Sequence, residues 1–253
     1  MKRIVYIGLD DTDVIGSPGT GRVARGLAEY LESLTFGYSK GVIRHQLLVD
    51  PRIRYTSHNS SKCILFETER SSIELQQPCI KYLAEHFQEG SDPGLCIGTK
   101  EQVSGELLVL GHLAQSDVIQ KQNVINLANG AGVLLAELGG TGDGIIGALA
   151  GFALTVGGND GRYVQLRGIK EIEGLITVEQ VKAKTDTACV VDEQGHLVSD
   201  KEIIDSLGWL RPSLVDGRPV LRVRLANNPA GKRIWEPVER RHTKPADYEG
   251  GQS

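Results

Sequence analysis

The chain has 253 residues and a formal net charge of −4, with 40% hydrophobic and 24% charged residues. This composition is typical of a folded globular protein, and no apolar run approaches the roughly 18 residues of a membrane span. The acidic balance disfavours a large nonspecific nucleic-acid surface. The four cysteines form no CxxC pair, which excludes a zinc ribbon of the usual spacing. The N-terminus does not resemble a secretion signal, so we expect a cytoplasmic protein with free thiols and no membrane partner.

The first ninety residues alternate strand and helix signals. Residues 4–9 form a β-branched and aromatic run that predicts a buried strand. Residues 20–34 place apolar side chains at helical spacing, with Thr20 as the expected N-cap. Strands are then predicted at 41–50 and 62–67, and a helix at 72–88.

The second part of the chain mixes the same kinds of element. A short strand at 95–97 precedes a stretch at 113–136 that is predicted to be largely helical, either as one helix or in two pieces. A glycine loop opens a helix of small residues within 138–158. The remaining signals predict a short helix at 177–183 and further strands at 162–166, 188–192 and 220–226. The chain is therefore predicted to have a mixed α/β (α+β) fold.

Three carboxylates, Asp10, Asp11 and Asp13, follow directly on the first predicted strand. Folds of the α/β type place ligands at the carboxyl ends of strands, and gathered like charges repel each other unless a cation or hydrogen-bond donors compensate. Oxygen-rich acid clusters suit Mg²⁺, which usually also binds substrate phosphates. A turn in which Asp side chains cap backbone amides is the alternative. The position between a strand and a glycine loop favours a metal or phosphate site.

A second candidate site is the glycine loop that precedes the apolar helix. Glycines let backbone amides approach an anion, and the following helix points its positive end at the same place. The spacing matches neither a Walker loop nor a dinucleotide fingerprint, and a tight turn into a closely packed helix is the alternative. Asp143 within the loop is either a metal ligand or a solvent-facing turn residue. The residues predicted to contact a nucleotide are Gly139, Gly140, Thr141, Gly142, Gly144 and Gly147.

A third stretch, residues 48–59, lies between two predicted strands and combines basic, aromatic and hydroxyl side chains. Such a loop can hold a phosphate or stack a base. We expect His58 to be a surface residue and not a catalytic base. The candidate substrate-binding residues of this loop are Arg52, Arg54, Tyr55, Thr56 and Asn59.

Taken in order, these stretches resemble one family, the archaeal tRNA-isoleucine agmatinylcytidine synthetases, in its catalytic half. The resemblance rests on DDTD at 10–13, on P-x-I-x-Y-T-x-x-N at 51–59 and on GIIGALA at 144–150, and it covers roughly residues 1–195. It implies a kinase-like domain followed by a ferredoxin-like domain. It also implies a reaction that uses ATP and Mg²⁺, in which the family activates an anticodon cytidine and attaches agmatine to it.

The resemblance also implies roles for individual residues. Asp10, Asp11 and Asp13 correspond to the acidic triplet that holds Mg²⁺ and the ATP phosphates. Thr20 corresponds to a threonine that family members phosphorylate on themselves. We therefore predict catalytic roles for Asp10, Asp11 and Thr20, and metal binding by the three aspartates.

The resemblance predicts a kinase-like domain at 1–90, a ferredoxin-like domain at 91–195 and a C-terminal appendage at 196–253. The family continues into an OB-fold and a zinc ribbon that grip tRNA, and the appendage has no zinc-ligand pairs. We therefore expect ATP- and Mg²⁺-dependent phosphoryl transfer to a smaller nucleotide-like or amine-accepting substrate. The alternatives are a non-catalytic nucleotide-binding or regulatory protein, and an RNA-modification subunit that needs a partner chain. Binding of tRNA and homo-oligomer formation are left open.

Overall fold

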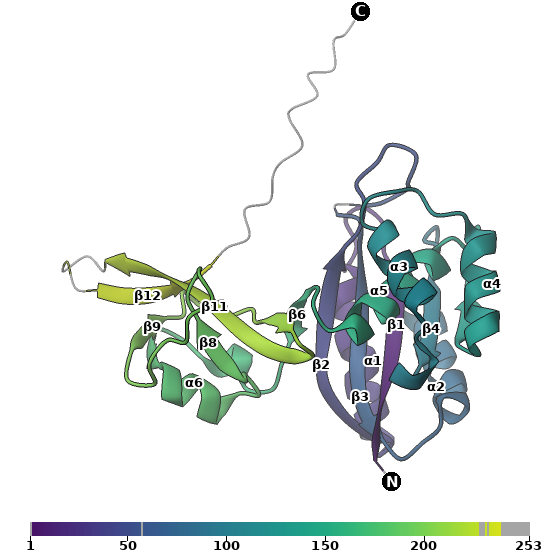
Figure 1. The fold of residues 1–253 in the computed structure, drawn as a ribbon. Helices are drawn as coiled ribbons and strands as arrows, with labels where there is room; N and C mark the ends of the chain where they lie inside the picture. The colour runs from purple at the N-terminus through teal and green to yellow at the C-terminus, as the bar shows by residue number, and fades with distance from the viewer. Residues whose placement is uncertain (1, 57, 228–230, 232, 239–253) are drawn as a thin grey trace, which may run out of the picture.

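The computed structural model describes residues 2–56, 58–227, 231 and 233–238. Two groups of elements lie side by side (Figure 1), and one sheet continues from the first group into the second. The strand order along this sheet is β5-β4-β1-β3-β2-β6-β10-β11-β12-β9-β7, and β8 pairs with β11 beside this path.

The first group contains an antiparallel sheet. Its strands come from the first ninety residues and from the segment that follows them. Strand β1 lies at its centre, between β3 and β4. Strand β2 pairs with β3 on one side, and β5 pairs with β4 on the other. The bounds are β1 (Arg3–Asp10), β2 (Gly37–Gln46), β3 (Ser60–Thr68), β4 (Gly94–Gly98) and β5 (Leu134–Glu137).

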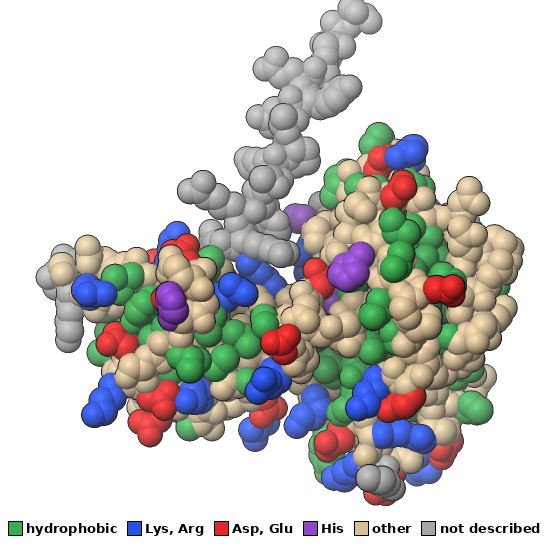
Figure 2. Space-filling view, in the orientation of Figure 1, with side chains coloured by type: hydrophobic (Ala, Val, Ile, Leu, Met, Phe, Trp, Pro, Cys, Tyr) green, Lys and Arg blue, Asp and Glu red, His purple; other side chains and the backbone are tan. Residues whose placement is uncertain are grey.

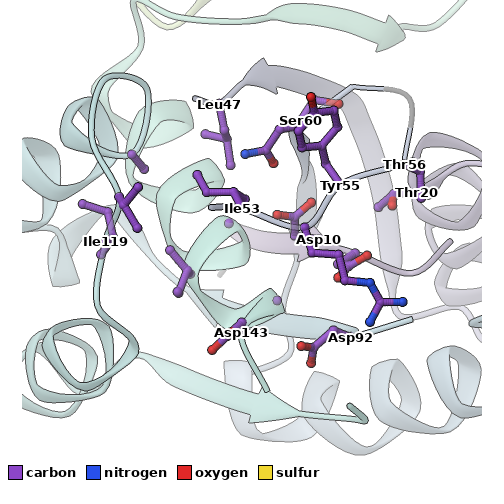
Figure 3. A pocket seen from close by; sticks show the side chains of 18 of the residues that line it. Asp10, Thr20, Leu47, Ile53, Tyr55, Thr56, Ser60, Asp92, Ile119 and Asp143 are labelled. Carbon is purple, nitrogen blue, oxygen red and sulfur yellow. The ribbon is translucent and has the colours of Figure 1, made fainter. Parts of the chain in front are cut away.

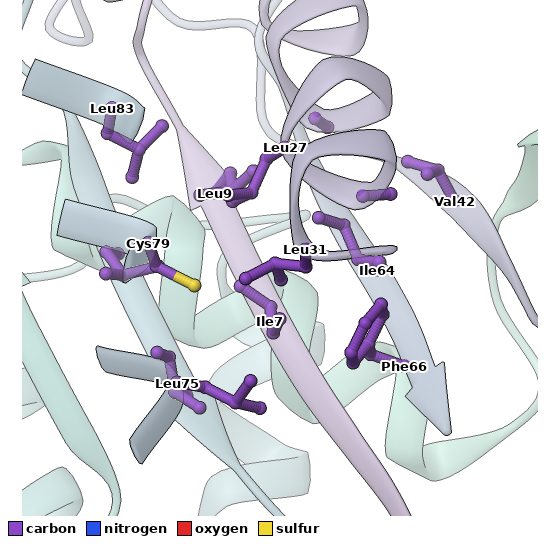
Figure 4. Packing of buried hydrophobic residues seen from close by; sticks show 14 of the residues in the cluster. Ile7, Leu9, Leu27, Leu31, Val42, Ile64, Phe66, Leu75, Cys79 and Leu83 are labelled. Atoms are coloured by element: carbon purple, nitrogen blue, oxygen red, sulfur yellow. The ribbon is translucent and has the colours of Figure 1, made fainter. Parts of the chain in front are cut away.

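Helices cover both faces of this sheet because its central strands are apolar on both sides. Helices α1 (Thr20–Ser33) and α2 (Ser72–His86) pack on one face, where Ile7, Leu27 and Phe66 belong to one buried cluster (Figure 4). The other face is covered by α3 (Gly105–Leu113), α4 (Lys121–Ala131) and α5 (Gly144–Gly157). A short 3₁₀ turn at Lys100–Gln102 leads from β4 toward α3.

The second group has its own apolar core and smaller elements. Strand β6 pairs antiparallel with β2 and so joins the two groups. Strand β11 pairs with β10, β12 and β8, and β9 pairs with β12 and β7. A 3₁₀ turn lies at Ile169–Glu171. The bounds are β6 (Arg162–Gln165), β7 (Leu175–Thr177), α6 (Val178–Lys184), β8 (Cys189–Val191), β9 (Ile203–Asp205), β10 (Ser213–Val215), β11 (Arg218–Asn227) and β12 (Arg233–Pro237).

One stretch differs clearly from its prediction, because residues 113–136 are not largely helical. Helix α3 ends at Leu113, and α4 ends before Gly132, which has the positive φ of 66° that often terminates a helix. The following apolar run becomes β5 because it pairs with the edge of β4. The second strand also starts and ends earlier than predicted, since β2 follows its pairing with β3 from Gly37 to Gln46.

The mixed α/β character predicted from the sequence is confirmed. The predicted boundary between residues 90 and 91 falls inside one sheet, because β4 and β5 pair onto the strands of the first ninety residues. The three-part division of the chain stays a prediction. Within the described residues, every helix is too short or too polar to cross a bilayer.

Candidate active site

The predicted site residues gather at one end of the first group of elements. A pocket of about 290 Å³ opens where β1 and β2 end and where β3, α1 and α5 begin. In Figure 3 the carboxylates of Asp10, Asp92 and Asp143 lie on one side, and Leu47, Ile53 and Ile119 lie on the other. The acid cluster after β1 and the glycine loop before α5 therefore meet in space.

Asp10 is the last residue of β1 and lies directly against α5. A Cβ atom at position 147 would overlap the Asp10 carboxylate, so only glycine allows this approach of the helix. Burial raises the pKa of Asp10 to about 7, the positive charge of Lys62 opposes this shift, and the other carboxylates of the cluster add to it. Its surroundings therefore favour the protonated form of the Asp10 carboxyl group more than water does.

Asp11 has a left-handed backbone with a φ of 47°, which is uncommon for a residue other than glycine. Its carbonyl oxygen accepts a hydrogen bond of 3.1 Å from the amide of Asp92, which ties the end of β1 to the start of β4. Burial and the nearby Asp92 carboxylate raise the pKa of Asp11 to about 6, and Arg54 opposes the shift. Strained backbone of this kind is often found at functional sites.

Asp13 is already well supplied with hydrogen bonds. Its Oδ1 accepts from the hydroxyl of Thr20 at 2.6 Å and from the Thr20 amide at 3.2 Å, and its Oδ2 accepts from the Thr56 hydroxyl at 2.9 Å. The N-cap of α1 is Gly19, not Thr20 as predicted, and Gly19 has no side chain to cap the helix. Asp13 supplies this function and fastens the loop between β2 and β3 to α1.

The glycine loop wraps around a carboxylate of the protein. The amides of Thr141 and Gly142 donate to Asp92 at 3.2 and 2.6 Å, and the Thr141 hydroxyl also donates to Asp92. Thr141, Gly144 and Gly147 line the pocket, whereas Gly139, Gly140 and Gly142 are not among its lining residues. Two amides predicted to be open to a phosphate are therefore occupied, and the loop presents mainly the first turn of α5 to the pocket.

The loop between β2 and β3 forms the outer wall of the pocket, and all five of its predicted residues line it. Arg52 is 67% exposed and forms a forked ion pair with Asp50, at 2.8 and 2.9 Å. Arg54 donates to the carbonyl of Gly90. The amide of Asn59 donates to the Leu48 carbonyl at 2.6 Å, which closes the base of the loop.

Several residues of the site were missed by the sequence reasoning. Lys62 on β3 is only 6% exposed, and its Nζ donates to the carbonyl and the hydroxyl of Ser60, which lines the pocket. Burial lowers the pKa of Lys62 to about 8, and Asp10 opposes this shift. The sequence signal that could have indicated Lys62 is the presence of a lysine in the otherwise largely apolar strand KCILFE. The apolar wall, which was not predicted, consists of Leu47, Ile53, Ala114, Val118, Ile119 and Ile146.

The carboxylate side chains that line the pocket are the candidate ligands of the predicted Mg²⁺ ion. In the described part of the chain, no group of three or more His, Cys, Asp or Glu side chains is placed to hold a metal ion by itself. Burial disfavours the ionised form of the Asp10 and Asp11 carboxyl groups, so a bound cation would stabilise it. The Asp143 side chain lines the pocket and does not cap α5 by a hydrogen bond. These residues fit an ion that takes one or two carboxylates and completes its shell with phosphate and water, as Mg²⁺ does.

The structure is that of an α/β protein with an acidic pocket where β1 ends. The solved structure of apo TiaS, a tRNA agmatidine synthetase, is similar to this chain, with 25% identity and a TM-score of 0.51 over 60% of this chain and 35% of that one. A tRNA fluorescent labelling enzyme is similar at 25% identity, with a TM-score of 0.52 over 60% of this chain and 36% of that one.

A complex of TiaS with its tRNA and ATP is similar at 24% identity, with a TM-score of 0.52 over 60% of this chain and 36% of that one. At this identity the similarity supports a shared fold and nothing more. No family model and no curated protein matches the chain. The resemblance to the catalytic half of TiaS is thus confirmed at the level of structure. The chain spans about a third of the length of these solved structures.

Proposed function

We propose that this chain is an ATP-dependent enzyme with TiaS-like chemistry, which transfers a phosphoryl group to a nucleotide-like or amine-accepting substrate. The observation that carries the proposal is the meeting of Asp10 and Asp11 with the first turn of α5 in one pocket. The fold of this chain is similar to that of TiaS, whose structure has been solved in complex with ATP.

Phosphate groups of ATP are proposed to lie beside the first turn of α5, where the positive end of the helix dipole attracts anions. Asp10 and Asp11 hold Mg²⁺ beside them, with Asp143 as a further ligand. When bound, the ion offsets the negative charge of the phosphates. Arg54 is held beside Asp11 and lines the same pocket, so it is placed to contact the transferred group.

The other residues of the pocket position the substrates. Asp13 keeps Thr20 and Thr56 in place and so fixes the loop between β2 and β3 over the pocket. The apolar wall around Ile53 and Ile119 suits the flat face of a base or an alkyl chain. The pocket volume of about 290 Å³ is that of a small-molecule site, which supports a substrate of limited size.

The proposal is tested by ATP turnover in the presence of Mg²⁺, followed by chromatography of ADP and other nucleotide products. The variant is Asp11→Asn, since Asn also tolerates a left-handed backbone. We expect turnover to fall by about 100-fold or more, because electrostatic stabilisation of transferred phosphate is lost. The matched control is Asp200→Asn, at a surface residue that pairs with Lys182 in the second group.

Full turnover by Asp11→Asn would contradict the role of the acid cluster. Absence of turnover in the unsubstituted protein, together with tight binding of Mg²⁺-ATP in calorimetry, would favour the non-catalytic nucleotide-binding alternative. Equal thermal stability of the two variants serves as the check that the fold is retained.

A further inference from the structure

A second pocket lies away from the candidate active site, where the two groups of elements meet. It has a volume of about 280 Å³ and is formed by the segment after α5 together with β6, β10 and β11. In Figure 2, blue side chains of Lys and Arg are visible on the side of the second group that faces the first. The lining contains three arginines, Arg162, Arg211 and Arg222, and one tryptophan, Trp209.

One arginine of this pocket, Arg162, continues a row of cations that crosses the sheet. Lys62 on β3 stands opposite Arg44 on β2, and Arg44 stands opposite Arg162 on β6. Residues directly opposite on neighbouring strands share a face of the sheet, so these three side chains lie on one face. Arg211 is close enough for its charge to lower the pKa of Arg44, in addition to the larger effect of burial.

Two arginines of this pocket, Arg211 and Arg222, have no acidic partner within the described part of the chain. The one carboxylate among the lining residues is Asp160, whose two oxygens are engaged by His45 at 2.7 Å and by Gln115 at 3.1 Å. Arg211 and Arg222 are exposed and form no ion pair with another residue of the described chain. Like charges repel each other, and an anion bound beside Arg211 and Arg222 would relieve that repulsion.

We propose that this second pocket binds a phosphate group, carried either by a small phosphorylated molecule or by the backbone of a nucleic acid. The guanidinium group is planar and matches two phosphate oxygens at once, so converging arginines suit phosphate better than a halide or a lone carboxylate. Trp209 is half-buried and offers a ring beside the anion for stacking of a base or a sugar. The site requires neither ATP nor Mg²⁺, so it stands independently of the proposed reaction.

Trp209 provides a direct measurement of binding. The chain has two tryptophans, so Trp235→Phe leaves Trp209 as the single tryptophan fluorophore. Inorganic phosphate is titrated into this protein at constant ionic strength, and a fluorescein-labelled single-stranded oligonucleotide is titrated separately by anisotropy without ATP or metal. The test variant adds Arg211→Ala and Arg222→Ala. The matched control adds Arg167→Ala, which removes an exposed arginine paired with Asp186 outside this pocket.

We expect the double arginine variant to lose about tenfold or more in affinity for at least one probe, while the control binds as before. A loss confined to inorganic phosphate assigns the site to small phosphorylated molecules. A loss for the oligonucleotide, with a salt dependence reduced by about 0.7 per lost contact, assigns it to a nucleic-acid backbone. The proposal is overturned if neither probe binds, or if the double variant and the control bind both probes equally. Because both arginines are exposed, unchanged thermal unfolding confirms that the variants are folded.

Discussion

At the residue scale, the most informative group is Asp10. Its unfolded pKa is near 3.8, and burial raises the folded value to about 7. A carboxyl group with a raised pKa favours folding while it is protonated. Its contribution is therefore fully present below about pH 4 and is lost as pH rises through about 7. At pH 8 the buried Asp10 anion reduces the stability of the protein.

This sign leads to a test of stability without metal or nucleotide. We expect Asp10→Asn to raise the free energy of unfolding at pH 8 by about 1 kcal/mol or more, and the gain to disappear below about pH 4. Lys62 loses a partner in this variant, but its lowered pKa of about 8 lets it release its proton. Denaturant unfolding at several pH values measures the effect. If the variant is less stable than the unsubstituted protein at pH 8, then neighbouring positive charges stabilise the Asp10 anion and the prediction is wrong.

The sequence predicted the residues of this site better than their hydrogen bonds. Asp10, Asp11 and Asp13 stand out because three acids follow one apolar strand. Nothing local distinguishes Asp13, which binds Thr20 and Thr56, from Asp11, which has a strained backbone. Lys62 and Asp92 reach the site through strand pairing and a loop far along the chain. Their contribution depends on contacts that a single stretch of sequence does not contain.

At the element scale, the site depends on how closely α5 approaches β1. Gly147 faces the Asp10 carboxylate, and a Cβ atom there has no space. The glycines of GIIGALA therefore serve close packing as well as a loop. The close packing that was the alternative explanation therefore applies at Gly147, and nucleotide binding by the loop stays a prediction.

The approach of α5 is tested by a pair of glycine substitutions. Gly147→Ala should displace either α5 or Asp10, lower the free energy of unfolding by about 1–3 kcal/mol and weaken binding of Mg²⁺-ATP. Gly130→Ala in α4 is the control, because nothing lies near its Cβ position and its φ is not positive. It should stabilise the protein by about 0.5–1 kcal/mol. Thermal unfolding and calorimetry measure both effects, and equal behaviour of the two variants would argue against the close contact.

Element boundaries were predictable where a local signal exists. Helix α2 begins at a capping box of Ser71 and Glu74, and α5 follows a glycine loop. Strand β5 was assigned to a helix because a short apolar run has no period that separates the two states. Its pairing with β4 decides the outcome, and that pairing joins segments more than thirty positions apart in the sequence.

At the scale of the whole molecule, the sheet explains why the predicted boundary after residue 90 has no counterpart in strand pairing. The order of elements along the chain suggested separate units, whereas antiparallel pairing inserts β1 between β3 and β4. The same sheet continues through β6 into the second group. It thereby connects the acidic pocket at one end of β1 with the arginine-lined pocket beside β6 and β11.

The proposed function requires that the acid cluster and the first turn of α5 enclose the phosphates of a nucleotide. This requirement can be examined in a crystal structure of the protein with Mg²⁺ and a nonhydrolysable ATP analogue. We expect the terminal phosphates to lie between the Asp10 and Asp11 carboxylates and the first turn of α5. A nucleotide bound elsewhere on the molecule, or one whose triphosphate points away from these aspartates, would rule out the proposed function.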